Sequence, residues 1–223
     1  MLPGKATPVS TYTLEEYLEA IYKISERGPV RPTMIAEAVK VSGPTVTATL
    51  KRLESRGLIT RSGSEVVLTS EGLKLALDII RRHRISERFL VDILGLPWDE
   101  AHEEACRLEH ALSPKVLERL EKYLDSPDAC PHGHPIPSAS GTINLVEARL
   151  LSEYGVGSKL QVSRVEEDDE ELLSHLGALG MYPGAQVVVT EIAPFDGPVT
   201  VSVDGKVQVI GSGVARAVYV TQQ

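Results

Sequence analysis

The spacing of apolar residues changes once along this chain, and that change limits the folds it can adopt. Up to about residue 125, apolar residues recur every three to four positions, as in amphipathic helices. From residue 158 onward they form short segments separated by turn sequences such as YPG and DGK, as in β-strands. The 223 residues are enough for two or three small domains. The sequence therefore predicts a multidomain α+β protein.

The first part of the helical region has the order of a winged helix-turn-helix. We expect helices over residues 13–26, 33–40 and 44–57, with Thr33 as the N-cap of the second. The segments LITRSG and SEVVLTS follow, and their alternation around Ser62-Gly63-Ser64 predicts a β-hairpin. These elements define a predicted DNA-binding domain over residues 1–75.

The remaining helices and the strands form two further predicted domains. Helices over residues 71–95, 98–112 and 113–125, the first with Ser70 as its N-cap, give a helical domain at 76–126. Residues 126–141 hold four prolines and two glycines, which indicates a linker, placed at 127–145. The strand segments then predict a small β-barrel at 146–223, interrupted by the acidic run EEDDEE.

Charge and composition narrow the functional classes. The net charge is −8, but residues 27–61 carry seven basic residues against Glu37 and Glu54, a local excess of +5. No apolar run approaches the roughly 18–20 residues of a membrane span, and the N-terminal segment lacks the apolar core of a signal peptide. Two cysteines in different contexts do not suggest a disulfide framework, so we expect a cytoplasmic protein without membrane partners.

The third helix carries the candidate DNA-reading residues. It begins SGPTVTATLKR, where Ser42 can cap the helix and Pro44 fits its first turn. Small polar side chains at the start of a helix in the major groove can reach bases and phosphates. An ordinary capped helix is the alternative, but the hairpin and the basic excess favour DNA binding.

The stretch AHEEACRLEH, residues 101–110, crowds potential metal ligands onto one helix. At ~100° per residue, His102, Cys106, Glu109 and His110 leave from one face of it. The alternative is a polar face with a packed cysteine. A single helix cannot surround an ion, so a metal site here needs ligands from elsewhere.

Other parts of the chain offer those ligands. His83 and Glu87 are spaced i,i+4 on the long helix. Glu16 and Glu19 are spaced i,i+3 on the first helix, although Glu16 also fits a capping box with Thr13, and Glu19 fits a solvated stretch. The acidic run is by default a solvated loop, but its Asp168 and Glu171 are oxygen donors three residues apart.

The segment CPHGHP, residues 130–135, also resembles a set of zinc ligands. Structural zinc sites use paired ligand spacings and four ligands, and no second cysteine lies nearby. We therefore interpret the segment as part of the linker.

Several of these motifs together resemble the diphtheria toxin repressor family of metal-dependent transcriptional regulators. They are SGPTVTATLKRLESRGLI, LTSEGLKLA, RRHRISERFLVDILGL, HEEACRLEHALS and CPHGHPIP. LGALGMYPGAQVVV followed by GPVTVSV resembles, more loosely, the SH3-like (FeoA-type) domain of longer members. The resemblance implies an N-terminal winged helix-turn-helix, a helical domain that binds metal and dimerises, and a C-terminal SH3-like domain.

The resemblance also implies a function: a homodimer, not an enzyme, that binds a palindromic DNA operator when loaded with a divalent metal and represses metal-uptake genes. It assigns no small organic substrate. Its primary metal site maps onto Glu16, Cys106, Glu109 and His110. Its ancillary site maps onto His83, Glu87, His102, Asp168 and Glu171, and manganese members add the position of Glu19. The candidate DNA-contacting residues are Arg31, Thr33, Ser42, Pro44, Thr45, Thr47, Lys51 and Arg52.

Two departures from the family pattern are informative. Glu16 replaces a methionine of the iron regulators, while Cys106 replaces a glutamate of the short manganese regulators. The carboxylate favours Mn(II), and the thiol keeps Fe(II), Co(II) and Zn(II) competitive, so we expect Mn(II) first, Fe(II) next, and Co(II) or Zn(II) as substitutes in vitro. Ala48 replaces a base-reading glutamine, so the operator can differ from that of the iron regulators.

Two other functions use the same residues. A metallohydrolase would need an open metal position for water and a general base, and the sequence offers no candidate base beyond the ligands. A winged-helix regulator of a small organic ligand would leave the histidines and acids as surface residues. The response of DNA binding to metal separates the three functions.

Overall fold

The structure, a computed structural model, describes residues 11–222 and divides into two compact units. The first comprises the chain up to residue 81 together with residues 139–141. The second comprises residues 82–138 and the chain from residue 142 onward. Each unit is described by itself.

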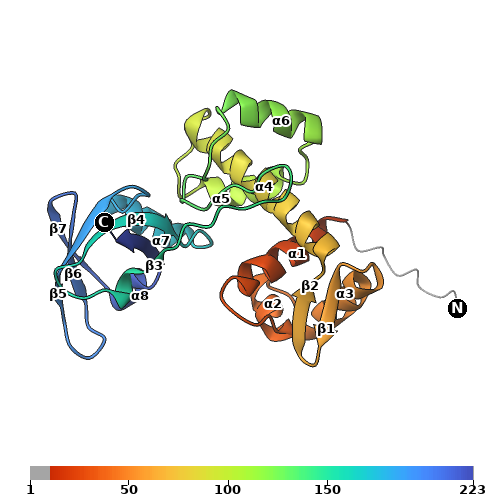
Figure 1. Ribbon diagram of the computed structural model, residues 1–223, viewed down its shortest axis with the longest axis horizontal. Helices are drawn as coiled ribbons and strands as arrows, with labels where there is room; N and C mark the ends of the chain where they lie inside the picture. Colours follow the sequence, from red (N-terminus) through yellow and green to blue (C-terminus); the bar gives the residue numbers. More distant parts are fainter. Residues whose placement is uncertain (1–10, 223) are drawn as a thin grey trace, which may run out of the picture. The chain divides into compact units, whose positions relative to one another are not determined.

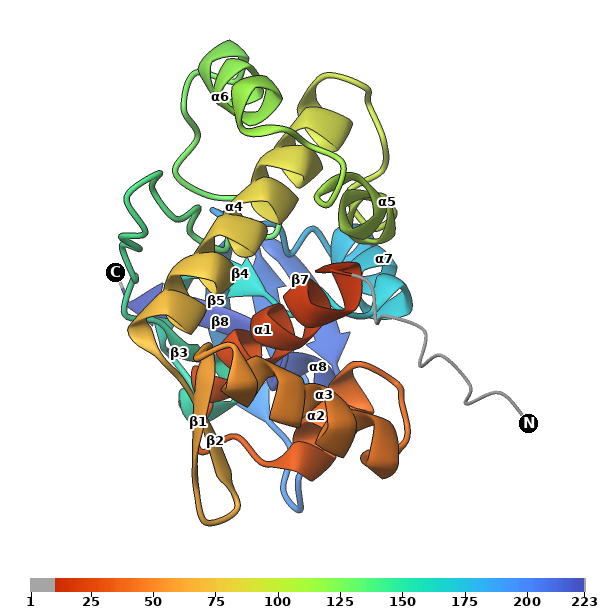
Figure 2. The same ribbon diagram turned by 90° about the vertical axis from the view of Figure 1, so that its right-hand side faces the viewer.

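The first unit is a winged helix-turn-helix. It contains α1 (Thr11–Ser25), α2 (Pro32–Ala38), α3 (Gly43–Ser55), β1 (Ile59–Ser62) and β2 (Glu65–Leu68). The two strands pair antiparallel, and their hairpin projects from the three helices as the wing (Figure 2). Ile21, Ile35, Leu50 and Leu53 are completely buried in a core that the three helices share, because their apolar residues recur at helical spacing. The predicted element order is confirmed.

The structure corrects two of the predicted helix starts among α1, α2 and α3 and agrees with the third. Helix α1 begins at Thr11, so Thr13 lies inside it, and the capping-box interpretation of Glu16 is wrong. Helix α2 begins at Pro32, so Arg31 occupies the N-cap and the prediction of Thr33 was wrong. A proline fits the first helical position because the amide hydrogen it lacks would have no helical partner there. Ser42 is the N-cap residue of α3, as predicted.

Helix α4 (Ser70–Asp92) crosses the boundary between the units along the sequence. The hydroxyl of Thr69 accepts a hydrogen bond from the Gly72 amide at 3.1 Å, so Thr69, and not the predicted Ser70, caps this helix. Ala76, Leu77, Ile79 and Ile80 of its first half belong to the core of the winged helix.

The second half of α4 lies between α5 (Ala101–Leu108) and α6 (Pro114–Tyr123) (Figures 1 and 2). Ala101 and Ala105 pack against Leu90, and Leu117 packs against Ile85. Helix α5 is shorter than the predicted 98–112. Glu109 and His110 therefore lie in the turn after it, although they remain close to the face that carries Cys106.

The remaining chain folds into one curled antiparallel sheet of order β3-β8-β4-β5-β6-β7 (Figure 1). Its strands are β3 (Arg149–Leu150), β4 (Lys159–Val165), β5 (Gln186–Ile192), β6 (Val199–Val203), β7 (Lys206–Ile210) and β8 (Val218–Gln222). Valines alternate inward along them, so Val187, Val189 and Val201 are completely buried. The short segments η1 (Leu151–Glu153) and α8 (Ser212–Ala215) complete this part of the fold together with α7 (Glu170–Ala178), which was expected after the acidic run.

Among the helices that the structure describes, none combines the length and the apolar character that crossing a membrane would require.

Candidate metal centre

His83 lies at the centre of a buried group of ligand-type side chains in the second unit. Its Nδ1 is 2.7 Å from Oε2 of Glu109, and its Nε2 is 3.1 Å from Oε1 of Glu87 and 3.1 Å from Nδ1 of His102. The Cys106 thiol lies 3.9 Å from His83 and 3.8 Å from His102. Helices α4 and α5 bring these residues together because the apolar faces of the two helices pack against each other. His83, His102 and Cys106 could hold one metal ion.

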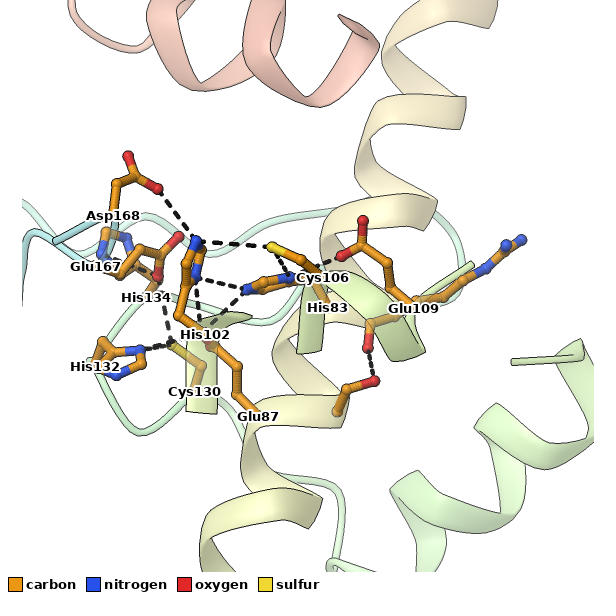
Figure 3. Close-up of polar contacts among 12 residues, drawn as sticks. His83, Glu87, His102, Cys106, Glu109, Cys130, His132, His134, Glu167 and Asp168 are labelled. Atoms are coloured by element: carbon orange, nitrogen blue, oxygen red, sulfur yellow. Dashed lines mark hydrogen bonds and ion pairs between the residues drawn. The ribbon is translucent and has the colours of Figure 1, made fainter. Parts of the chain in front are cut away.

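A second group adjoins the first and includes Cys130 and His132, which belong to the predicted linker segment. Glu87, Cys130, His132 and Glu167 are all buried, and each can place one ligand atom within 4.8 Å of the others. Nδ1 of His132 is 3.2 Å from Oε1 of Glu87, and the Cys130 thiol is 3.9 Å from Oε2 of Glu167. Figure 3 shows these side chains pointing toward one another from α4 and from two loops. They combine carboxylate, imidazole and thiol ligands.

The segment from Cys130 to Pro135 is folded tightly onto its neighbours. Gly133 has a φ of +88°, and a Cβ there would lie 2.1 Å from the backbone oxygen of Ser163 in β4. The backbone amide of Val165 donates to the carbonyl of His132 at 3.0 Å, and Arg84 of α4 donates to the carbonyl of Pro135 at 2.6 Å. Only a glycine permits this close approach to β4.

Cys130 and His132 are candidate ligands that the sequence reasoning passed over. The signal was visible as a cysteine and two histidines within five residues. The segment lacks a second cysteine and the paired spacing of a structural zinc site, and the partners that complete the group, Glu87 and Glu167, are distant in sequence. The third ligand-type residue, His134, contacts Glu167 at 3.5 Å and the carbonyl of Val165 at 2.8 Å.

Glu87 joins the two groups. Its side chain is completely buried, and one of its oxygens, Oε1, lies within 3.4 Å of nitrogens of His83, His102 and His132. Its other oxygen, Oε2, is buried and has no hydrogen-bond partner in the part of the chain that the structure describes. A buried carboxylate oxygen without a partner is costly, and a cation would satisfy it.

The buried histidines and the buried carboxylate of the centre shift one another's pKa values. Burial alone would lower the pKa of His83, but the charge of Glu87 and the hydrogen bonds that the protonated ring donates to Cys106, Glu109 and Glu87 raise it well above its ordinary value. Burial would likewise lower the pKa of His132, but the charge of Glu87 and the hydrogen bond to it outweigh burial, so this pKa is also raised. Burial would raise the pKa of Glu87, but the charges of His83 and His132 hold it well below its usual range. The imidazoles thus carry the positive charge that a bound cation would supply.

The two thiols differ. The pKa of Cys106 is lowered, because hydrogen bonds from His102 and His83 outweigh the effect of burial, whereas burial and the charge of Glu87 raise the pKa of Cys130 well above its usual range. Cys106 is therefore the readier thiolate.

The structure brings together most of the predicted ligands of the second unit. His83, Glu87, His102, Cys106 and Glu109 are in contact; His110 lies 3.2 Å from Glu109, and Asp168 lies 3.5 Å from His102. Glu171 is exposed in the first turn of α7 and is not among the clustered ligands. Glu16 is exposed on α1, and Glu19 pairs with Lys23 at 3.3 Å. Both belong to the first unit, and their part in metal binding stays a prediction.

The candidate DNA-reading residues lie on the outer side of the winged helix. Val46, Thr49, Leu50 and Leu53 form the inner face of α3. Seven of the eight predicted contact residues are exposed, and Arg52 is half-buried. The exposed ones are Arg31, Thr33, Ser42, Pro44, Thr45, Thr47 and Lys51.

Comparison with known families assigns each part of the chain. Residues 10–66 match the N-terminal DNA-binding domain of iron-dependent repressors, residues 69–138 match their metal-binding and dimerisation domain, and residues 149–222 match the FeoA domain. The iron-dependent repressor IdeR of Mycobacterium tuberculosis is 39% identical over 211 residues, covering 86% of this chain and 89% of IdeR. The chain belongs to the iron-dependent repressor family.

Other proteins similar to this chain support the same family assignment. The diphtheria toxin repressor of Corynebacterium diphtheriae is 33% identical over 219 residues, covering 87% of this chain and 90% of that protein. A manganese-dependent transcriptional repressor in complex with manganese superposes with a TM-score of 0.90 at 33% identity, covering 94% of this chain and all of that one. The predicted resemblance and fold class are confirmed. This family consists of transcriptional regulators rather than enzymes.

Proposed function

We propose that this protein is a metal-activated repressor that binds a palindromic DNA operator as a homodimer and controls genes for metal uptake. Mn(II) is the proposed physiological metal and Fe(II) the second candidate. The matches to a DNA-binding domain and to a metal-binding and dimerisation domain support this proposal.

The observation that carries the proposal is the state of Glu87. A completely buried carboxylate is surrounded by three imidazoles and the Cys130 thiol, and one of its oxygens has no partner among the described residues. The donors are the residue types that hold divalent transition metals, so they fit the metal that the family implies. A bound divalent cation would offset the repulsion among Glu87, Glu109 and Glu167.

Helix α4 carries two of the ligands and also contributes to the core of the DNA-binding unit. Ile79 and Ile80 pack in the core of the winged helix, and His83 and Glu87 follow one and two turns later on the same helix. Ligands that hold the second half of α4 in one arrangement therefore restrict the conformations open to its first half. A tenfold change in operator affinity needs only ~1.4 kcal/mol of difference in metal binding between the two conformational states.

The mixture of carboxylate and thiol ligands supports a divalent metal of intermediate hardness. Glu87, Glu109 and Glu167 provide the carboxylates that suit Mn(II), while Cys106 and Cys130 leave Fe(II), Co(II) and Zn(II) competitive. The relatives point both ways, since IdeR is named for iron and the structural neighbour for manganese. Operator titrations with each of the four metals, combined with metal analysis of purified protein, test the order.

The decisive variant is Glu87→Gln, which keeps the shape of the side chain and removes its charge. We expect Mn(II) affinity to fall by roughly 100-fold and the metal-dependent part of operator binding to be lost. Glu104→Gln is the matched control, because Glu104 is an exposed glutamate on α5 paired with Arg107. Isothermal titration with Mn(II) and fluorescence anisotropy with labelled operator measure the two effects.

Two results would contradict the proposal. Operator binding that is indifferent to Mn(II), Fe(II), Co(II) and Zn(II) would favour a regulator of another ligand. Full metal activation in Glu87→Gln would show that the buried centre does not control DNA binding.

A further inference from the structure

Trp98 connects the candidate metal centre to the SH3-like domain. It lies in the segment before α5, and its ring packs against the hydrophobic core of the sheet domain. Its ring centroid lies 5.3 Å from that of His132 and 4.7 Å from that of Tyr182. The Trp98 ring therefore contacts a candidate ligand and the chain just beyond α7.

The backbone of Trp98 sets the orientation of His132. Nε2 of His132 lies 2.8 Å from the Trp98 carbonyl oxygen, and a carbonyl only accepts, so Nε2 carries the hydrogen. Nδ1 then faces Glu87 at 3.2 Å and the Cys130 thiol at 4.0 Å. A histidine fixed in this way presents the Nδ1 lone pair to a metal.

Gly177 lets α7 pack onto the same tryptophan. A Cβ at Gly177 would lie 2.9 Å from Nε1 of Trp98 and 3.0 Å from the hydroxyl of Tyr182. Helix α7 is also tied to the centre through the chain, because Glu167 lies two residues before its N-cap, Asp169. Any shift of α7 against Trp98 would move Glu167 and disturb the support of His132.

We propose that Trp98 is a positioning residue that couples metal binding by Cys130, His132, Glu87 and Glu167 to the seating of α7 of the SH3-like domain. The coupling is reciprocal, so the metal stabilises the seated domain and the seated domain raises metal affinity. The proposal rests on the proposed function, since it takes the divalent metal of that function as the ligand.

The test is Gly177→Ala, made in a Cys106→Ser background so that Cys130 is the one remaining thiol. Cd(II) is the probe, and its thiolate charge-transfer absorption reports binding at Cys130. Alanine is the better helix former, yet we expect Cd(II) affinity to fall roughly tenfold because the methyl group meets the indole. Adding Trp98→Phe removes Nε1 and should restore most of the affinity.

Gly213→Ala in α8 is the matched control, because a Cβ there meets no atom within 4 Å. The chain has one tryptophan, so in variants that keep Trp98 its emission should change with the same midpoint as the Cd(II) absorption. A merely structural role for Trp98 would produce neither this coincidence nor the rescue. If circular dichroism shows Gly177→Ala to be unfolded, Trp98→Ala, which keeps the carbonyl but removes the seat of α7, should show the same loss.

The outcomes separate the two proposals. Unchanged Cd(II) affinity in folded Gly177→Ala, or no restoration by Trp98→Phe, overturns the coupling and leaves the metal centre standing. Absence of Cd(II)–thiolate absorption in the Cys106→Ser parent overturns the Cys130 centre itself, and the coupling with it.

Discussion

The position of Glu87 on α4 explains why its side chain is completely buried and why its Oε2 has no partner among the described residues. One helical turn separates it from His83, so both side chains face the ligands of α5 and of the Cys130–Pro135 segment. The raised pKa values of His83 and His132 show how the metal-free protein balances the buried acid, with protons in place of a cation. Metal binding must displace these protons, so metal affinity rises with pH.

The stability of the metal-free protein should depend on pH in a defined direction. A histidine whose pKa is raised by folding stabilises the protein below its unfolded value of 6.5. This stabilisation is lost as the pH rises through the raised folded value. The lowered pKa of Glu87 acts in a separate window, since its contribution is lost only as the pH falls below 4.5.

We therefore expect the melting temperature of the metal-free protein to fall as the pH rises above 6.5, and His132→Gln to make that fall less steep. Calorimetry of the parent and of His132→Gln, each treated with a chelator, measures the melting temperature at each pH. A melting temperature that rises over this range in the parent, with the same slope in His132→Gln, would contradict the assignment.

At the scale of elements, α3 separates its two tasks by face. Leu50 and Leu53 fix the helix in the core, and Thr45, Thr47 and Lys51 remain exposed on the outer side. Under the proposed function the threonines contact bases and Lys51 contacts phosphate, so their replacements should have different effects on operator binding.

Lys51→Ala should weaken binding to specific and nonspecific DNA alike and lower the slope of log affinity against log salt by about 0.9. Thr45→Ala should instead reduce the preference for operator over unrelated DNA. Salt titrations by anisotropy measure both, with the exposed Lys122→Ala on α6 as the control for charge. An unchanged salt slope in Lys51→Ala would place the DNA on another surface.

At the scale of the whole molecule, metal binding and the free energy of unfolding are thermodynamically linked. Ligands of the centre come from α4, from α5, from the Cys130–Pro135 segment and from the loop before α7. A metal held by all of them ties the helical domain to the SH3-like domain within the second unit. Anything that binds only the folded state stabilises that state.

At a free Mn(II) concentration of 100 times its Kd, the second unit should gain about 2.7 kcal/mol, and chelation should remove this gain. Urea unfolding with and without chelator measures the difference, and Glu87→Gln should not show it. Equal stability with and without Mn(II) would argue against a metal held by the folded core.

The sequence by itself determined the elements and the family. Apolar periodicity, glycine and proline positions and turn motifs act over a few residues, so α3, the wing and the main strands were predictable. The ligand character of His83, Glu87, His102 and Cys106 was likewise visible in their spacing.

Only the tertiary structure decided which ligands share a centre. Periodicity fixes the direction of a side chain on its own helix, but the distance between elements depends on packing. Gly133 lets the Cys130–Pro135 segment approach the backbone of β4, and Gly177 lets α7 approach the Trp98 ring. These contacts place Cys130 and His132 beside Glu87 and Glu167. A segment that composition assigned to a linker thus becomes part of the candidate centre, because burial against distant partners cannot be deduced from local sequence.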